Sequence, residues 1–177
     1  MLEGLLVGLA SGIICSAMIW GFSKTIRPKI KISENMAQRC IKNSDNIECR
    51  VKFYNRSRWV LKVIEYKLYF AQVNNYNQSV GITDVKPRFD PITAVSKHTK
   101  EAPFEHAVQI IYDVPPNLYP NQQEQYFLFS ITVQHGLTGT TKTIQKRYHP
   151  SQILKGTFAV GDSTSINAFQ DTERQSP

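Results

Sequence analysis

The pattern of apolar and polar positions divides the chain into an uncharged N-terminal run and a longer, alternating remainder. Residues 4–22 (GLLVGLASGIICSAMIWGF) carry no charged side chain. At a helical rise of about 1.5 Å per residue, this run reaches roughly 28 Å, close to the thickness of a bilayer's hydrocarbon core. Because the run is apolar on every face, it favours a membrane-spanning helix over the core helix of a folded domain. A cleaved signal peptide is disfavoured, because the chain begins Met-Leu-Glu without a basic residue.

Basic residues follow this run closely, at Lys24, Arg27, Lys29 and Lys31. Positively charged flanks stay on the cytoplasmic side of a membrane. We therefore expect a single-pass protein of the inner (plasma) membrane, with its N-terminus outside and its C-terminal domain in the cytoplasm. The same four side chains are predicted to contact anionic lipid headgroups. Pro28 cannot continue a helix, so the domain should begin close to the membrane surface.

Small residues recur every fourth position within the uncharged run, at Gly4, Gly8, Gly12 and Ser16. This spacing places them on one stripe of a helix, where small side chains let two backbones approach closely. The stripe predicts self-association of the helix into a homo-oligomer. Glycine is also simply common in membrane helices, and that alternative stays open.

Alternating and β-branched or aromatic segments dominate the rest of the chain, which favours strands. A single helical turn is expected at residues 149–154, and a long, irregular loop at residues 72–103, with one or two short strands within it. The expected strands are residues 29–33, 47–54, 59–70, 80–83, 92–95, 104–114, 125–134, 140–148 and 156–160.

About seven main strands separated by turns, without an amphipathic helix, are typical of an antiparallel β-sandwich of immunoglobulin-like type. A small β-barrel is the alternative. The predicted organisation is a transmembrane anchor (1–23), a basic juxtamembrane segment with the first strand (24–33), the β-sandwich domain (28–166) and a polar tail (167–177).

Composition adds little chemistry to this picture. The net charge is +7. Outside the juxtamembrane cluster the basic residues are scattered and form no basic stripe, so a nucleic-acid partner is not predicted. Cys15, Cys40 and Cys49 are too few for a disulfide framework. Cys40 and Cys49 could pair in principle, but in a reducing compartment all three are expected to remain thiols.

No arrangement of residues predicts catalysis. The four histidines do not have metal-ligand spacing, and nucleophile-elbow, phosphate-loop and dinucleotide motifs are absent from the sequence. We therefore assign no catalytic, cofactor-binding or metal-binding residue and expect a protein that is not an enzyme. One turn stands out, because Arg56, Arg58 and Trp59 combine positive charge with an aromatic ring. These three could contact a ligand or a headgroup surface; alternatively, the turn is solvated and Trp59 enters the core.

The segments RPKIKIS (27–33) and ECRVKFYNRSR (48–58), placed after a short anchor, resemble small bacterial single-pass membrane proteins with a cytoplasmic β-sandwich. This resemblance implies a membrane-tethered, non-enzymatic binding or adaptor module, whose partner is the bilayer together with an unknown protein or small ligand. A weaker likeness is to membrane-anchored, β-rich effectors of bacterial antiphage signalling. It implies the alternative function, an effector that oligomerises through its anchor and perturbs the membrane.

Overall fold

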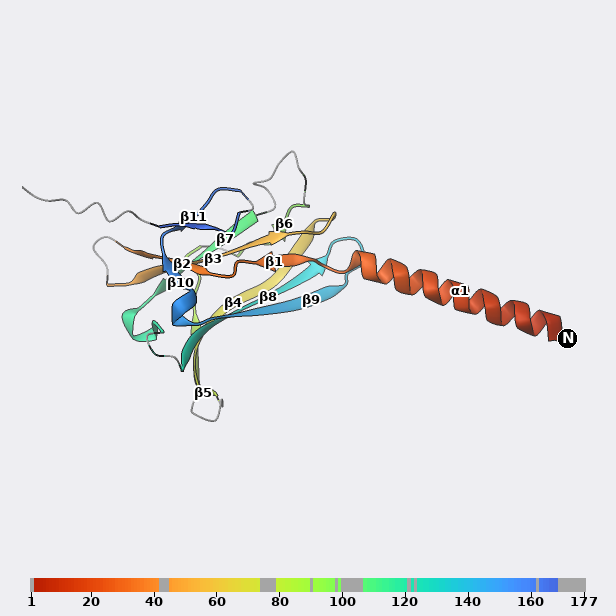
Figure 1. The fold of residues 1–177 in the computed structure, drawn as a ribbon, viewed down its shortest axis with the longest axis horizontal. Helices are drawn as coiled ribbons and strands as arrows, with labels where there is room; N and C mark the ends of the chain where they lie inside the picture. The colour runs from red at the N-terminus through yellow and green to blue at the C-terminus, as the bar shows by residue number, and fades with distance from the viewer. Residues whose placement is uncertain are drawn as a thin grey trace, which may run out of the picture.

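The computed structural model places a helix beside a β-rich domain, from which the helix projects as a rod (Figure 1). The structure describes residues 2–41, 45–73, 79–89, 91–97, 99, 107–120, 122, 124–161 and 163–168, but not the side chains of 2–7, 22–25 and 79–80. The description below is confined to these residues.

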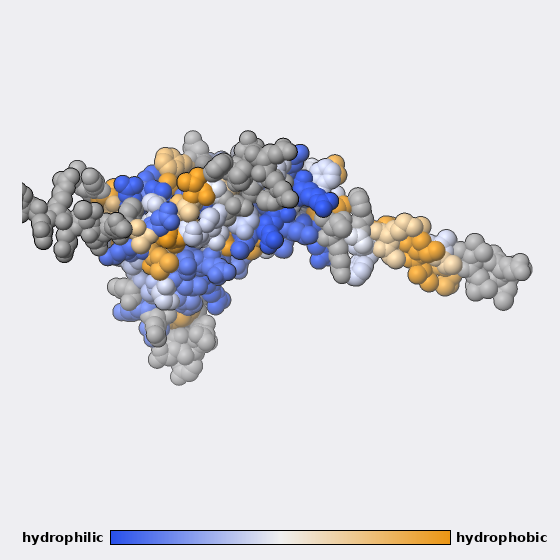
Figure 2. All heavy atoms as spheres, turned by 45° about the horizontal axis from the view of Figure 1, so that its top comes forward, coloured by the Kyte–Doolittle hydropathy of each residue, from blue (hydrophilic) through white to orange (hydrophobic). Residues whose placement is uncertain are grey.

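Helix α1 (Leu2–Ile26) contains the uncharged run and ends just before Arg27 and Pro28, where the proline was predicted to stop it. Its described side chains at residues 8–21 are all exposed, and they form an apolar segment in the space-filling view (Figure 2). Its large apolar side chains are between 54% and 68% exposed: Leu9, Ile13, Ile14, Met18, Ile19 and Trp20. Among the residues that the structure describes, no helix is both long enough and apolar enough to cross a membrane, so the predicted transmembrane span is not found there.

The first sheet of the described residues has five strands arranged around a central one, β3. On one edge of β3, β1 pairs with its end and β2 with its beginning; on the other edge, β7 pairs along nearly its whole length. β10 then adds to β2 in parallel. The strands are β1 (Ile30–Ile32), β2 (Met36–Cys40), β3 (Ile47–Asn55), β7 (Ala107–Val114) and β10 (Ile153–Lys155).

The second sheet of the described residues also has five strands and is antiparallel throughout. Its centre is the long pair β4–β8, with β9 beside β8; β5 and β6 lie beside opposite ends of β4. The register of β4 against β8 shifts between Val63 and Glu65, a bulge that bends the strand. The strands are β4 (Leu61–Val73), β5 (Ser79–Val85), β6 (Ala94–Val95), β8 (Gln125–His135) and β9 (Thr141–Tyr148).

The two sheets share one hydrophobic core, built from alternate residues of their facing strands. Phe53 of β3 and Phe129 of β8 meet there with ring centroids 6.3 Å apart, and neither side chain is accessible to solvent. This alternation of buried and exposed positions is clearest along β8. Burial of these apolar faces is the main force that holds the domain together.

A C-terminal hairpin, β11 (Thr157–Phe158) with β12 (Ile166–Asn167), covers part of the outer face of β3. The hairpin buries Lys52 of β3. The Nζ atom of Lys52 donates to the carbonyl oxygens of Ala159 at 2.7 Å and Ser163 at 2.8 Å. These bonds satisfy the ammonium group, which would otherwise be costly to bury.

The expectation of a mainly β protein is confirmed, and most predicted strands are present with shifted ends. The prediction missed β2, β10 and β12, so the described residues form twelve strands where nine ranges, about seven of them main strands, were expected. The predicted helical turn after Tyr148 is the short 3-10 helix η2 (Pro150–Gln152), and another, η1 (Pro116–Leu118), follows β7. The N-terminal part of the predicted strand 104–114 lies outside the described residues.

Candidate anion-binding pocket at the helix junction

A rigid turn joins β3 to β4 and presents the two arginines and the tryptophan singled out in the sequence. The turn is organised by Asn55, whose side chain is fully buried. Its amide nitrogen donates to the carbonyl oxygens of Trp59 at 2.7 Å and Ser96 at 2.9 Å, and its oxygen accepts from the backbone N–H of Ser57 at 2.7 Å. A short asparagine side chain suits this role because it bonds local backbone on both its amide and its carbonyl sides.

Strand β1 brings the segment that leaves α1 alongside this turn. Ile30 pairs with Asn55, so Lys29 lies beside the turn. The backbone N–H of Arg56 donates to the carbonyl of Lys29 at 2.7 Å, and the backbone N–H of Lys29 donates to the hydroxyl of Ser57 at 2.8 Å. The segment between α1 and β1 and the β3–β4 turn are therefore fixed to each other by one backbone–backbone and one backbone–side-chain hydrogen bond.

A hollow of about 550 Å³ lies between these two segments, and we call it the junction pocket. It is lined by Ile26, Arg27, Lys29, Arg56, Ser57, Arg58, Trp59 and Leu137. Four of these residues are cationic and none is acidic. Among the residues that the structure describes, none of the four cations forms an ion pair. The pocket thus concentrates positive charge that no carboxylate of the described chain neutralises.

Apolar side chains border the same pocket. Trp59 is 48% exposed, with its ring centroid 6.0 Å from that of the buried His135 in an edge-on contact. The alternative in which Trp59 enters the core is therefore wrong, because the first buried residue after Trp59 is Leu61, two residues later at the start of β4. Val60 and Leu137 are also exposed, so the end of the domain nearest α1 combines basic and apolar side chains.

A second, smaller hollow of about 350 Å³ shares Arg27 with the junction pocket. It is lined by Arg27, Pro28, Thr140, Thr141 and Lys142. Lys142, at the start of β9, therefore extends the basic surface around the base of α1. Figure 1 shows the β8–β9 turn and the β3–β4 turn next to the point where α1 joins the domain.

The structure brings together only part of the predicted basic cluster. Arg27 and Lys29 line the junction pocket together with Arg56, Arg58 and Trp59, which sequence reasoning had treated as a separate feature. Lys31 is exposed on β1 and does not line the pocket, and the side chain of Lys24 lies outside the described residues.

The predicted small-residue stripe is described in part, since the surroundings of Gly4 lie outside the described residues. A Cβ atom built at Gly8 or Gly12 would meet nothing within 4 Å. The hydroxyl of Ser16 donates to the carbonyl of Gly12 at 2.8 Å, a bond within the helix. Self-association through this stripe stays a prediction.

A second charged cluster, elsewhere on the domain, holds two parts of the domain together. Arg88, after β5, pairs with Glu48 of β3 at 2.6 Å and with Asp113 of β7, and Arg50 also pairs with Glu48. These pairs tie the segment after β5 to the outer face of the first sheet. Both acids are matched by arginines, so the cluster offers no free charge for chemistry.

Glu48 makes this cluster sensitive to acid. Burial raises the pKa of its carboxyl, but the hydrogen bonds and charges of Arg50 and Arg88 outweigh that effect and leave the pKa below its usual value. A depressed pKa in the folded state means that stability is present above the unfolded-state pKa and is lost as the pH falls through the folded-state pKa. We expect the urea concentration at the unfolding midpoint to decrease as the pH is lowered from about 5 to about 3. Glu48→Gln should reduce this fall, and an unchanged pH dependence in the variant would assign the acid sensitivity to other groups.

Candidate metal ligands and thiols are dispersed over the described residues. No group of three or more His, Cys, Asp or Glu side chains gathers among the described residues. His98 and His106 lie outside them. Cys15, Cys40 and Cys49 are free, with Cys49 buried and the other two exposed.

Several residues that support or line the two hollows were not recognised from the sequence. Asn55 and Ser57 looked like ordinary turn residues, and Leu137 and Lys142 belong to a hairpin distant in sequence. A local signal for Asn55 was present, because a turn asparagine commonly accepts a hydrogen bond from the backbone N–H two residues on, here that of Ser57. No local signal places Leu137 and Trp59 around one pocket, because their proximity depends on the pairing of β4 with β8.

No protein-family model and no curated protein matches this sequence. Among solved structures, the chain is similar to one described as the X-ray structure of Northeast Structural Genomics Consortium target SoR45. The two share 9% sequence identity with a TM-score of 0.37, and the match covers 71% of this chain and 87% of the other. A similarity at this level carries no inference about function.

Proposed function

We propose that this protein is a non-enzymatic binding or adaptor module that α1 tethers to the inner (plasma) membrane, with the β domain in the cytoplasm. The observation that carries the proposal is the union of two features. An exposed, apolar helix leads directly into a basic pocket with an exposed tryptophan at its base. Each feature matches one layer of a membrane: the hydrocarbon core and the anionic headgroup region.

The apolar side chains of α1 support the tether. Exposed to water, they would form a contiguous apolar surface of a kind that soluble monomers rarely carry. The described exposed segment, residues 8–21, reaches roughly 21 Å, and the uncharged run of residues 4–22 reaches roughly 28 Å. Of these two lengths, the roughly 28 Å of residues 4–22 approaches the hydrocarbon thickness of a bilayer.

The pairing of the strands supports an immunoglobulin-like sandwich as the binding scaffold. β1, β3 and β7 pair as strands A, B and E do in that fold, while β5, β4, β8 and β9 follow the order C′, C, F and G. Sandwiches of this type commonly bind through loops at one end of the domain. The junction pocket lies at such an end, formed partly by the β3–β4 turn.

Thiol labelling tests the proposed orientation, with Cys40 as the reporter. Cys40 is exposed, whereas Cys49 is buried and its thiol pKa is raised to about 12 by burial and by the charge of Glu48. Only Cys40 should therefore react in the folded domain. In cells producing the Cys15→Ser chain, a membrane-impermeant maleimide should label Cys40 only after permeabilisation. Labelling in intact cells, with Cys40→Ser as the blank, would place the domain outside.

A second function, a membrane-perturbing effector, is favoured by one observation. The Gly8 and Gly12 positions of α1 are open, with space for a second helix to approach. Gly12→Leu should then abolish self-association measured by crosslinking in membranes, and any toxicity on overproduction. Ala10→Leu, on the opposite face of the helix, is the matched control and should leave both unchanged. Equal crosslinking of the two variants would exclude assembly through this stripe.

A further inference from the structure

We propose that the junction pocket binds the phosphate of an anionic lipid headgroup. This inference rests on the proposed membrane tether and adds a defined ligand to it. The pocket's four cations come from two separate segments, Arg27 and Lys29 from the exit of α1 and Arg56 and Arg58 from the β3–β4 turn. Opposed in this way, they can surround one phosphate rather than attract anions diffusely.

The charge of the pocket selects an anion. No acidic side chain lines it, and none of its cations is paired among the described residues. Arginine presents a planar, bidentate donor set that matches phosphate oxygens, and lysine adds a point charge. A phosphate would therefore gain charge-assisted hydrogen bonds without displacing an existing ion pair.

The backbone around the pocket is already ordered. Asn55 fixes the turn through bonds of 2.7 Å to 2.9 Å, and the Lys29–Arg56 and Lys29–Ser57 bonds fix the opposing segment. A ligand therefore has to order only the arginine and lysine side chains. Such preorganisation lowers the entropy cost of binding.

The position of the pocket favours a lipid over a soluble phosphate. It begins at Ile26, the last residue of α1, so a bilayer that holds α1 would present its headgroups at this level. Trp59 and Leu137, both exposed, border the pocket and suit the boundary between headgroups and acyl chains. A soluble phosphate would leave these apolar side chains without a role.

The test uses the full chain carrying Trp20→Phe, so that Trp59 is the remaining tryptophan and reports on the pocket. The protein is reconstituted in nanodiscs of phosphatidylcholine alone or mixed with phosphatidylglycerol. We expect a blue-shifted Trp59 emission, and quenching by lipids brominated near the headgroup, in the anionic discs only. Arg56→Gln/Arg58→Gln should abolish both responses.

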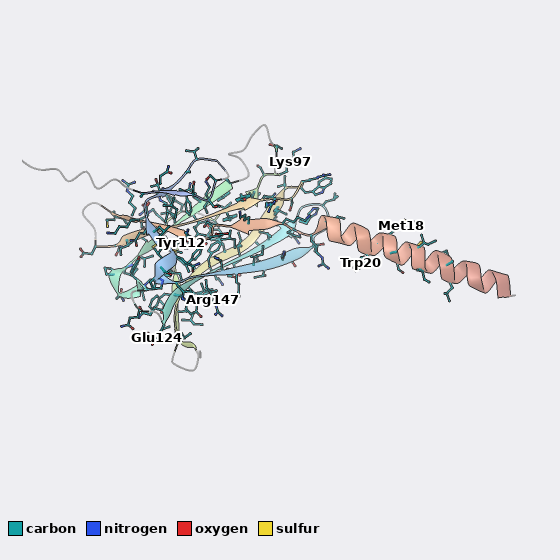
Figure 3. The ribbon with its side chains drawn as sticks, in the orientation of Figure 1. Met18, Trp20, Lys97, Tyr112, Glu124 and Arg147 are labelled. Atoms are coloured by element: carbon teal, nitrogen blue, oxygen red, sulfur yellow. The ribbon has the colours of Figure 1, made fainter. Side chains whose placement is uncertain are left out.

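The matched control removes the same charge elsewhere, with Arg147→Gln/Lys155→Gln. Arg147 lies on the domain away from α1 (Figure 3), at the far end of β9, and Lys155 is exposed on β10. This control should keep both responses. If both double variants lost the Trp59 responses equally, specific binding in the junction pocket would be contradicted, and diffuse electrostatic attraction would explain the responses. Inorganic phosphate that reverses the blue shift at concentrations too low to screen charge would identify a soluble ligand and overturn the lipid assignment.

The same experiment separates this inference from the proposed function. A chain that does not incorporate into discs of either composition contradicts the membrane tether itself. A chain that incorporates equally into both, with identical Trp59 emission, leaves the tether standing and contradicts only the headgroup site.

Discussion

Replacing Asn55 with alanine is expected to lower the free energy of unfolding by about 3 kcal/mol, because buried hydrogen-bonding groups are left without partners at about 1–3 kcal/mol each. The substitution removes the donor to the carbonyls of Trp59 and Ser96 and the acceptor for the N–H of Ser57. It also releases the turn that carries Arg56 and Arg58, so the pocket should lose its order together with the stability. Urea unfolding in detergent micelles, followed by tryptophan fluorescence, measures the first effect.

Asn117→Ala is the control for this substitution. Asn117 is exposed in η1, and the same change there should alter stability by less than about 0.5 kcal/mol. An Asn55→Ala chain as stable as the Asn117→Ala chain would show that the turn does not depend on the asparagine side chain.

Phe129→Ala is expected to cost about 3–5 kcal/mol, the usual range for a large aromatic side chain deleted from a packed core. Phe129 lies in the middle of β8, fully buried, with its ring stacked on Phe53 of the opposing sheet. The cavity left behind would separate the two sheets at their centre, where neighbouring side chains cannot collapse without moving a strand. The urea midpoint should fall accordingly.

Phe89→Ala provides the same chemical change at an exposed position, where the side chain is 64% accessible. Its effect should stay within about 0.5 kcal/mol. Similar midpoints for Phe129→Ala and Phe89→Ala would mean that the sheets do not pack through Phe129.

Strands rich in alternating, β-branched or aromatic residues could be predicted from the sequence, whereas β2, β10 and β12 could not. In β8, buried residues alternate with partly exposed ones from Phe127 to His135, so a local pattern defined the strand. β2 reads Met-Ala-Gln-Arg-Cys, without β-branched residues, and is a strand because it adds to the edge of β3. Its pairing with β10, more than a hundred residues later, has no local signal.

The burial of Lys52 could not be predicted from its local sequence either. Lys52 occupies an outward position of β3, where a lysine is normally solvated. It is buried because the C-terminal hairpin crosses above it and supplies two carbonyl oxygens. Only the tertiary path of the chain determines that environment.

The candidate site was predicted as two unrelated groups of basic residues. Charge and aromatic content drew attention to Arg56, Arg58 and Trp59, and the flank of the uncharged run drew attention to Arg27 and Lys29. The register that pairs Ile30 with Asn55 joins them into one pocket. Register depends on which faces of the strands are buried together, and that was not fixed by either segment alone.

The most direct test of the membrane tether is alkaline extraction of membranes from cells that produce the full chain. High pH and carbonate release proteins held only by charge, whereas an inserted apolar helix resists extraction because its side chains would have to enter water. We predict that the chain stays in the membrane pellet, and that Ile13→Lys/Met18→Lys, which places two charges on the exposed surface of α1, moves it to the supernatant. Full release of the unaltered chain would contradict the account.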